Sequence, residues 1–190
     1  MIKQLWSTPV LQRKMNDFLR EELINRLMQD YDIFNPPSDY SKINVLDNKA
    51  TEIQQFLYGE VLPSFEEFCD LSLNKTLSDW TGYRVNGWLT GSSKDYSMQL
   101  HNHAGSQFSA VFYLLCEEHE MGGEIVFTDP RQNANRGYDS KFESWFEPLK
   151  IIPKSGDILV FPSYLYHTVL TYHSNLRLAM PVDCFLFADS

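Results

Sequence analysis

Residues 108–116 read FSAVFYLLC, a short apolar run rich in β-branched and aromatic residues. Such a composition is typical of a β-strand. Similar short segments surround it, separated by Gly, Pro, Asn, Asp and Ser: GYRVNGWLT (82–90), YSMQLHNH (96–103), GEIVFTD (123–129), FEPLKIIP (146–153), DILVFP (157–162), HTVLTY (167–172) and LRLAMPVDCFLF (176–187). Many short strands with turn signals between them predict a β-sandwich or barrel for residues 76–190.

The chain before residue 76 has a helical apolar pattern instead. Apolar residues recur at helical spacing from Leu11 to Met28, which predicts one helix of about five turns. A second helical pattern runs from about Thr51 to Leu73, and Pro63 is expected to split or kink it. We therefore expect one domain over residues 1–190, in which a helical support (1–75) packs on a mainly β, double-sheet jelly-roll core (76–190).

Composition excludes several classes of protein. Hydrophobic residues make up 43% of the 190, enough for a packed core, so global disorder is excluded. The formal net charge of −9 and the lack of a basic cluster argue against a nucleic-acid partner. The three cysteines, none in a CxxC pair, argue against a disulfide scaffold or a zinc ribbon. No apolar run approaches the roughly 20 residues of a membrane span, and no signal peptide is recognisable. We expect no membrane partner and a cytoplasmic location, or the host cytoplasm for a phage protein.

Three of the five histidines are candidate metal ligands. His101 and His103 end a strand-like segment, where residues i and i+2 face the same side. His167, at the end of DILVFPSYLYH, is placed to supply a third imidazole from another strand. Imidazole suits iron, copper, zinc and nickel. His119, in a charged stretch, and His173, near a turn, are expected to be surface residues; ordinary polar roles for His101 and His103 are the alternative.

Arg177 lies ten residues after His167 in the apolar segment NLRLAMPV. A buried guanidinium is costly unless it is paired with an anion, and it can donate two parallel hydrogen bonds to a carboxylate. The sequence leaves two partners open, a carboxylate of a bound ligand or an acidic residue of the protein itself.

The order of these motifs resembles the 2-oxoglutarate/Fe(II)-dependent oxygenase superfamily. The resemblance rests on HNH (101–103), FSAVFYL (108–114), GGEIVFTDPR (122–131), SGDILVFPSYLYH (155–167) and Arg177. More narrowly, the chain is similar to a group of small bacterial and phage oxygenases with an HxH motif. Its segment LWSTPV (5–10) also resembles the N-terminal motif of that group. The resemblance spans nearly the whole chain and implies a double-stranded β-helix, which is a distorted jelly roll.

The resemblance also implies Fe(II) as cofactor, with His101 and His167 as ligands. The carboxylate ligand of the superfamily maps onto His103, which is a departure. Either His103 binds the iron, or water takes that place, or His103 is the proximal ligand in a shifted register with Gly105 at the carboxylate position. Asp129 is a further candidate carboxylate.

By the same resemblance, Arg177 would bind the outer carboxylate of 2-oxoglutarate, and the Tyr113 phenol would also contact 2-oxoglutarate; a core strand tyrosine is the alternative for Tyr113. An unidentified small molecule or a peptide or protein side chain would be hydroxylated. No catalytic residue is expected beyond the metal ligands. Candidate pocket walls are aromatic: Trp88, Phe112, Phe127, Phe161, Tyr164 and Tyr166. Loops 91–96 and 132–145, with Arg131 and Arg136, are candidates for substrate specificity.

Two other functions fit the same pattern. One is a cupin-like metalloenzyme that uses the barrel and the histidines without 2-oxoglutarate, for which Arg177 would have no purpose. The other is a non-catalytic jelly-roll module, such as a carbohydrate-binding or phage structural protein, in which the histidines would lie apart. The oligomeric state is not predicted.

Overall fold

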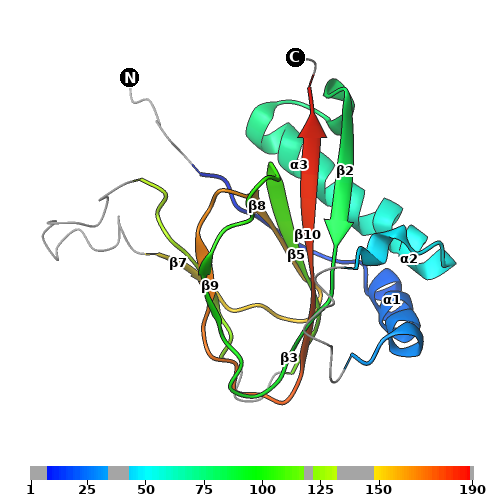
Figure 1. The fold of residues 1–190 in the computed structure, drawn as a ribbon, viewed down its shortest axis with the longest axis vertical. Coiled ribbons are helices and arrows are strands. Elements are labelled where there is room, and N and C mark those ends of the chain that lie inside the picture. Colours follow the sequence, from blue (N-terminus) through cyan, green and yellow to red (C-terminus); the bar gives the residue numbers. More distant parts are fainter. Residues whose placement is uncertain (1–7, 34–42, 118–121, 132–147, 189–190) are drawn as a thin grey trace, which may run out of the picture.

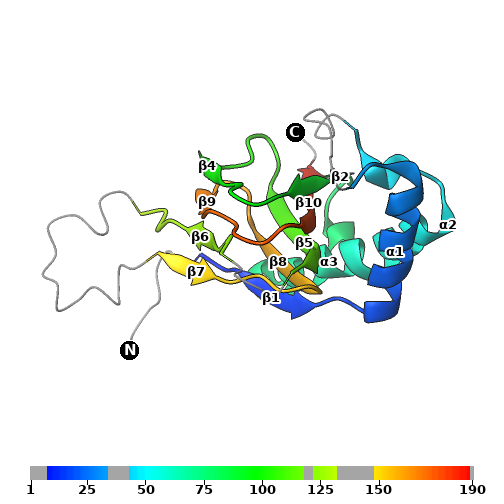
Figure 2. The same ribbon diagram turned by 90° about the horizontal axis from the view of Figure 1, so that it is seen from below.

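The computed structural model describes residues 8–33, 43–117, 122–131 and 148–188. Within these residues the chain forms two facing β-sheets with helices on the outer face of one of them (Figures 1 and 2). The strands of both sheets pair antiparallel with their neighbours. The predicted double-stranded β-helix is confirmed, although the described strands form two separate sheets and no closed barrel.

The larger sheet has six strands in the order β1-β8-β5-β10-β2, with β3 also paired to β10. Its strands are β1 (Leu11–Lys14), β2 (Gly82–Gly87), β3 (Thr90–Ser92), β5 (Phe108–Cys116), β8 (Asp157–Pro162) and β10 (Arg177–Phe187). The bounds of β5 and β8 are those expected from the sequence. Both are continuous apolar runs because each is covered on both faces, by helices on one side and by the second sheet on the other (Figure 2).

The smaller sheet has four short strands in the order β4-β9-β6-β7. They are β4 (Met98–His101), β6 (Ile125–Phe127), β7 (Leu149–Ile151) and β9 (His167–Val169). This sheet faces the larger one across the side opposite to the helices (Figure 2). The space between the two sheets is therefore walled by inward-facing side chains of both.

Alternation along the central strands separates two apolar cores. Ala110, Phe112 and Leu114 of β5 pack with the helices, whereas Val111 and Tyr113 face the second sheet. The edge-to-face pair of Phe112 and Phe56, with ring centroids 5.4 Å apart, shows the helical side of this division. Phe112 therefore lies behind the sheet, and its expected place in the pocket wall is wrong.

The helical layer consists of α1 (Asp17–Asp30), α2 (Thr51–Phe56) and α3 (Leu62–Leu73), with a π-helical turn (Leu57–Val61) between α2 and α3 and short 3-10 turns at Val45–Asp47 and Leu77–Asp79. The π turn lies where Pro63 was expected to disturb the second helix. Proline lacks an N–H and its ring crowds the carbonyl four residues earlier, here Gly59, so the regular α-helical bonding is interrupted before it. No helix in the described part of the chain is long and apolar enough to cross a membrane.

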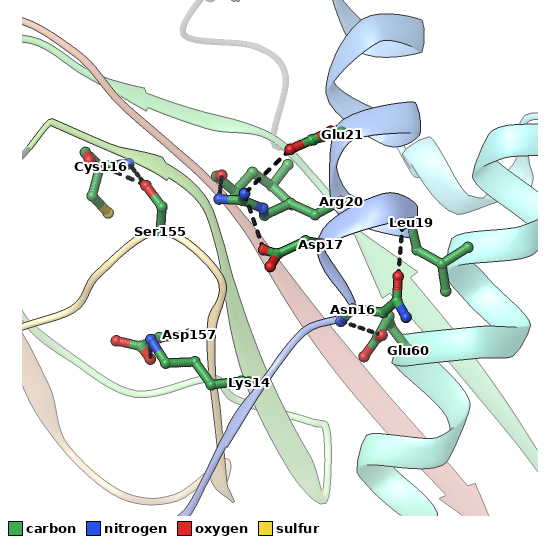
Figure 3. Close-up of polar contacts among 11 residues, drawn as sticks. Lys14, Asn16, Asp17, Leu19, Arg20, Glu21, Glu60, Cys116, Ser155 and Asp157 are labelled. Atoms are coloured by element: carbon green, nitrogen blue, oxygen red, sulfur yellow. Dashed lines mark hydrogen bonds and ion pairs between the residues drawn. The ribbon is translucent and has the colours of Figure 1, made fainter.

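The prediction of a single helix from Leu11 to Met28 is wrong over its first turn. Residues Leu11–Lys14 form β1, which pairs with the edge of β8, and their burial alternates with period two. The helix starts only after Asn16, whose side chain accepts a hydrogen bond from the Leu19 backbone N–H at 3.2 Å (Figure 3). Phe18 and Met28 are exposed on the outer face of α1.

Asn16 is expected to stabilise this strand-to-helix junction by about 1 kcal/mol, as N-cap side chains typically do. Asn16→Ala should lower the melting temperature by roughly 2–4 °C in a protein of this size. Asn16→Ser, which keeps a capping oxygen, should restore most of the loss. Thermal unfolding followed by circular dichroism measures both variants; equal melting temperatures for wild type and Asn16→Ala would contradict a capping role.

Candidate metal centre

His101 and His167 are direct neighbours on adjacent strands. They are paired in the register of β4 with β9, and their ring centroids lie 4.3 Å apart. Opposite residues on neighbouring antiparallel strands project from the same face of a sheet. Both imidazoles therefore point from the smaller sheet into the space between the sheets.

His103 reaches the same place from a loop. β4 ends at His101, so the expected strand alternation between His101 and His103 is not what aligns them. Instead the His103 backbone N–H donates to the Ser163 carbonyl at 3.0 Å. Its ring centroid lies 5.5 Å from that of His101 and 5.3 Å from that of His167. The three side chains offer ligand atoms that all lie within 4.8 Å of one another, so the expected convergence is confirmed.

Each imidazole uses one ring nitrogen in a hydrogen bond and leaves the other nitrogen available. Nδ1 of His101 lies 2.8 Å from the Gln99 carbonyl oxygen, and Nδ1 of His167 lies 3.0 Å from that of Leu165. Carbonyl oxygens only accept, so both Nδ1 atoms carry the proton. Nδ1 of His103 lies 2.7 Å from Oδ1 of Asp183. In all three rings Nε2 is the atom with a lone pair available for a metal.

Burial keeps two of these rings neutral. Burial, followed by the neighbouring histidines, lowers the pKa of His167 to about 4 against the bond to Leu165. Burial also lowers the pKa of His101. Neutral imidazole is the form that binds metal ions, so at neutral pH these two rings are ready to bind one.

Arg177 faces the histidines from the larger sheet. It is 4% exposed, and its Nη1 donates to the Gly123 carbonyl at 2.7 Å. Its Nη2 lies 3.5 Å from the Ser92 hydroxyl, and its Nε has no hydrogen-bond partner. No carboxylate of the described residues forms an ion pair with it. Pairing with an acidic residue, one of the two partners that the sequence left open, is thus not found in the described part of the chain.

Two tyrosine rings flank the guanidinium. The Arg177 Cζ atom lies 5.9 Å from the ring centroid of Tyr113 and 5.2 Å from that of Tyr172. The Tyr172 hydroxyl is used internally, since it donates to the Leu176 carbonyl at 2.8 Å. The Tyr113 hydroxyl makes no hydrogen bond within the described residues, and burial raises the pKa of this phenol. Tyr113 therefore stays protonated beside Arg177 and has a donor to offer.

Gly123 makes room for the arginine. It has a φ of +69°, and a Cβ atom at this position would lie 2.6 Å from Nη1 of Arg177. A positive φ of this size by itself favours glycine. The close approach of the guanidinium is a second reason why a side chain does not fit here.

The three histidines, Arg177 and Tyr113 line one pocket of about 520 Å³, counting the space at its mouth. The other lining residues are mostly apolar: Trp88, Thr90, Ser92, Tyr96, Met98, Val111, Ile125, Val169, Ala179 and Pro181. Within the described residues, the lining contains the Arg177 guanidinium and no acidic side chain. It therefore favours an anionic ligand beside the histidines.

Some of the aromatic residues and loops expected at the pocket line it, and others do not. Trp88 lines the pocket, and Phe127 and Phe161 pack on the His167 ring, at centroid distances of 5.7 and 5.0 Å. Tyr164 and Tyr166 are 56% and 50% exposed, so they do not belong to the pocket wall. Of the segment 91–96, Ser92 at the end of β3 and Tyr96 line the pocket. His119, Arg136 and loop 132–145 lie outside the described residues.

Asp129 does not join the histidines. Its carboxylate binds the Arg131 side chain, with Nε 2.9 Å from Oδ1, and it is not one of the clustered ligand residues. Asp183, which contacts His103, was missed in the sequence. Period-two alternation from Arg177 along β10 does place Asp183 on the inward face, and this signal would have singled it out.

Taken with the fold, this pocket gives a jelly-roll protein a candidate three-histidine metal centre beside a buried arginine. Residues 86–183, more than half of the chain, match the sequence profile of a family described as "Putative 2OG-Fe(II) oxygenase". The chain belongs to this family of 2-oxoglutarate- and Fe(II)-dependent oxygenases. It is thus a non-haem iron enzyme with 2-oxoglutarate as cosubstrate, as the order of its motifs indicated.

Solved structures share the fold at low sequence identity. A prolyl-4-hydroxylase from Pseudomonas putida superposes with a TM-score of 0.62 at 14% identity, covering 97% of this chain and 90% of that one. HygX from Streptomyces hygroscopicus, solved with nickel and 2-oxoglutarate, gives 0.59 at 15% identity, covering 93% and 82%. A 2OG-Fe(II) oxygenase family oxidoreductase from Burkholderia pseudomallei gives 0.50 at 18% identity, and 72% of this chain covers only 56% of that longer protein. The search of curated proteins gave no match.

Proposed function

We propose that the chain is a hydroxylase whose Fe(II) is held by Nε2 of His101, His103 and His167, and whose 2-oxoglutarate is held by Arg177. The observation that carries this proposal is one pocket containing both a three-imidazole cluster and a buried guanidinium without an acidic partner. A metal site alone would suit many jelly-roll enzymes. The orphaned Arg177 adds a requirement for a carboxylate ligand at the same place.

The donor set fits iron. Neutral imidazole is a suitable ligand for Fe(II), so the three histidines would hold the iron beside the part of the pocket where 2-oxoglutarate would bind. Of the three alternatives for the carboxylate position, ligation by His103 itself agrees best with the geometry. A shifted register would leave His101 without a role, whereas His101 lies within the same cluster as the other two rings.

Bound iron with 2-oxoglutarate and O2 supplies the oxidative decarboxylation to succinate and CO2 that drives hydroxylation of a C–H bond. The chain's own residues position the reactants. Arg177 would hold the distal carboxylate by charge-assisted hydrogen bonds, and the protonated Tyr113 hydroxyl would add one more donor. The apolar lining and the packed Phe127 and Phe161 rings behind His167 exclude water from the centre.

The substrate is proposed to be a small molecule or a peptide or protein side chain that enters past Trp88. Trp88 is partly exposed, lines the pocket, and its ring lies 5.8 Å from that of His103. Peptide substrates have support from a similar fold: a prolyl hydroxylase from Trichoplax adhaerens, 16% identical with a TM-score of 0.59, is solved with a peptide fragment. The apolar wall favours an uncharged group next to the iron.

Turnover of 2-oxoglutarate tests this function before a substrate is found. We expect slow succinate formation by the iron-loaded protein in air with ascorbate present, followed by proton NMR. Decarboxylation of 2-oxoglutarate takes up one oxygen atom of O2, and without a substrate ascorbate would supply the two electrons that reduce the other atom to water. Omission of Fe(II) or of O2 should each abolish succinate formation. Iron-loaded protein that neither binds nor consumes 2-oxoglutarate would overturn the proposal in favour of a cupin-like enzyme.

A further inference from the structure

Asp183 lies behind His103 on the inward face of β10. The side chains of β10 alternate, so that Arg177, Ala179 and Pro181 line the pocket and the next inward position is Asp183. The same strand thus carries Arg177 at its start and a carboxylate three inward positions further along. Asp183 is not itself one of the pocket-lining residues, and it reaches the candidate metal centre only through the His103 ring.

The contact between His103 and Asp183 is short and largely shielded from water. Nδ1 of His103 lies 2.7 Å from Oδ1 of Asp183, and the two side chains are 8% and 13% exposed. The Ser109 hydroxyl donates to the same Oδ1 atom, also at 2.7 Å. In the other two rings of the cluster Nδ1 meets a neutral backbone carbonyl. Only His103 therefore has a charged partner.

Three serine hydroxyl groups form a chain of hydrogen-bond donors that ends at the contact between His103 and Asp183. Oγ of Ser163 lies 2.7 Å from that of Ser109 and 2.8 Å from that of Ser106. A hydroxyl has one proton, and Ser109 gives its proton to Asp183, so Ser163 donates to Ser109. Ser106 in turn donates to Ser163. The chain of hydroxyl donors thus ends on Oδ1 of Asp183, which accepts from Ser109 and from Nδ1 of His103.

The contact between His103 and Asp183 bears on the departure at position 103, where the superfamily has a carboxylate ligand. A carboxylate ligand would bring a negative charge to Fe(II), whereas three imidazoles bring none. A carboxylate bonded to the far nitrogen of a ligand histidine fixes the ring and raises its basicity as a ligand. We propose that Asp183 is a positioning residue that supplies this negative charge through His103, in place of a carboxylate bound directly to the metal. This inference rests on the proposed function, because it requires His103 to bind the iron.

Two Asp183 variants separate charge from orientation. Asp183→Asn keeps an oxygen that can accept from Nδ1 but removes the charge, and Asp183→Ala removes both. Fe(II) affinity, measured by anaerobic calorimetry, should fall about 10-fold in Asp183→Asn and up to about 100-fold in Asp183→Ala, the range found for such outer partners. Asp70→Asn, which removes the same charge from an exposed position on α3, is the matched control and should bind Fe(II) like wild type.

A second measurement needs no metal. Nitrogen-15 NMR of the histidine rings in the metal-free protein reports which nitrogen carries the proton. His103 should be protonated at Nδ1 in wild type and in Asp183→Asn, and should become a mixture of tautomers in Asp183→Ala. A residue that only stabilised the fold would lower the melting temperature without changing the His103 tautomer. Should Asp183→Ala fail to fold, the charge test still stands on Asp183→Asn.

The outcomes distinguish the two proposals. Wild-type protein that binds no Fe(II) at the histidines would overturn both of them. Wild-type protein that binds Fe(II), together with undiminished affinity in both Asp183 variants and an unchanged tautomer in Asp183→Ala, would overturn the role of Asp183 alone. Loss of affinity in both variants with an intact control supports it.

Discussion

Arg177→Leu is expected to weaken 2-oxoglutarate binding by a factor of about 30 or more while Fe(II) remains bound. The guanidinium is 4% exposed, its Nε has no partner, and no acid of the described residues pairs with it. A dicarboxylate ligand supplies the missing charge, and loss of such a buried pair typically costs about 2–5 kcal/mol. Leucine fills part of the space and leaves the metal ligands in place.

Anaerobic calorimetry of the Fe(II)-loaded protein with 2-oxoglutarate measures this loss. Arg84→Leu is the matched control, because Arg84 is an exposed arginine of β2 that stacks on Phe185 outside the pocket. It removes the same charge and should leave the 2-oxoglutarate affinity within about twofold of wild type. Unchanged affinity in Arg177→Leu with iron still bound would instead favour a cupin-like enzyme.

The second large effect is expected at the histidines. His101→Ala, His103→Ala and His167→Ala should each weaken Fe(II) binding by more than about 100-fold, beyond the 10- to 100-fold typical of partners one bond further out. Each change removes one of three clustered ligand atoms, and no further His, Cys, Asp or Glu of the described residues belongs to the cluster to replace it.

Metal titration of the three variants also assigns His103. His173→Ala is the control, because His173 is exposed and outside the cluster. Full Fe(II) affinity in His103→Ala would show that water or another group fills that position, and the charge proposed for Asp183 would then have no route to the metal. Full affinity in His101→Ala would favour the shifted register of the HxH motif.

Local patterns were sufficient for the strands but not for the start of the first helix. The apolar runs of β5 and β8 are unambiguous because both faces of these strands are buried. Leu11 and Met15, by contrast, fit a helical as well as an extended spacing. Their conformation is decided by the free edge of β8, more than 140 residues away in the chain, to which β1 pairs from Leu11↔Val160 to Lys14↔Asp157. Such a nonlocal partner leaves no trace in the local spacing.

The residues of the site, too, could be predicted from the sequence only in part. His101, His103, His167 and Arg177 stood out because each is a polar residue in an apolar or strand-like segment. Phe112 and Tyr113 were both expected at the pocket, although neighbours on a strand face opposite sides. β5 is apolar on both sides, so alternation alone does not say which side holds the pocket. The significance of Asp183 can be recognised only from its tertiary contact with His103, which lies 80 residues earlier in the chain.

Iron and 2-oxoglutarate are expected to bind at one centre in this pocket. Anaerobic titration followed by visible absorption tests it directly. Fe(II) alone and 2-oxoglutarate alone should give no visible band, and the two together should give a weak charge-transfer band that saturates at one equivalent of each. The contradicting result is protein that binds Fe(II) at the histidines and gains neither the band nor any affinity for 2-oxoglutarate.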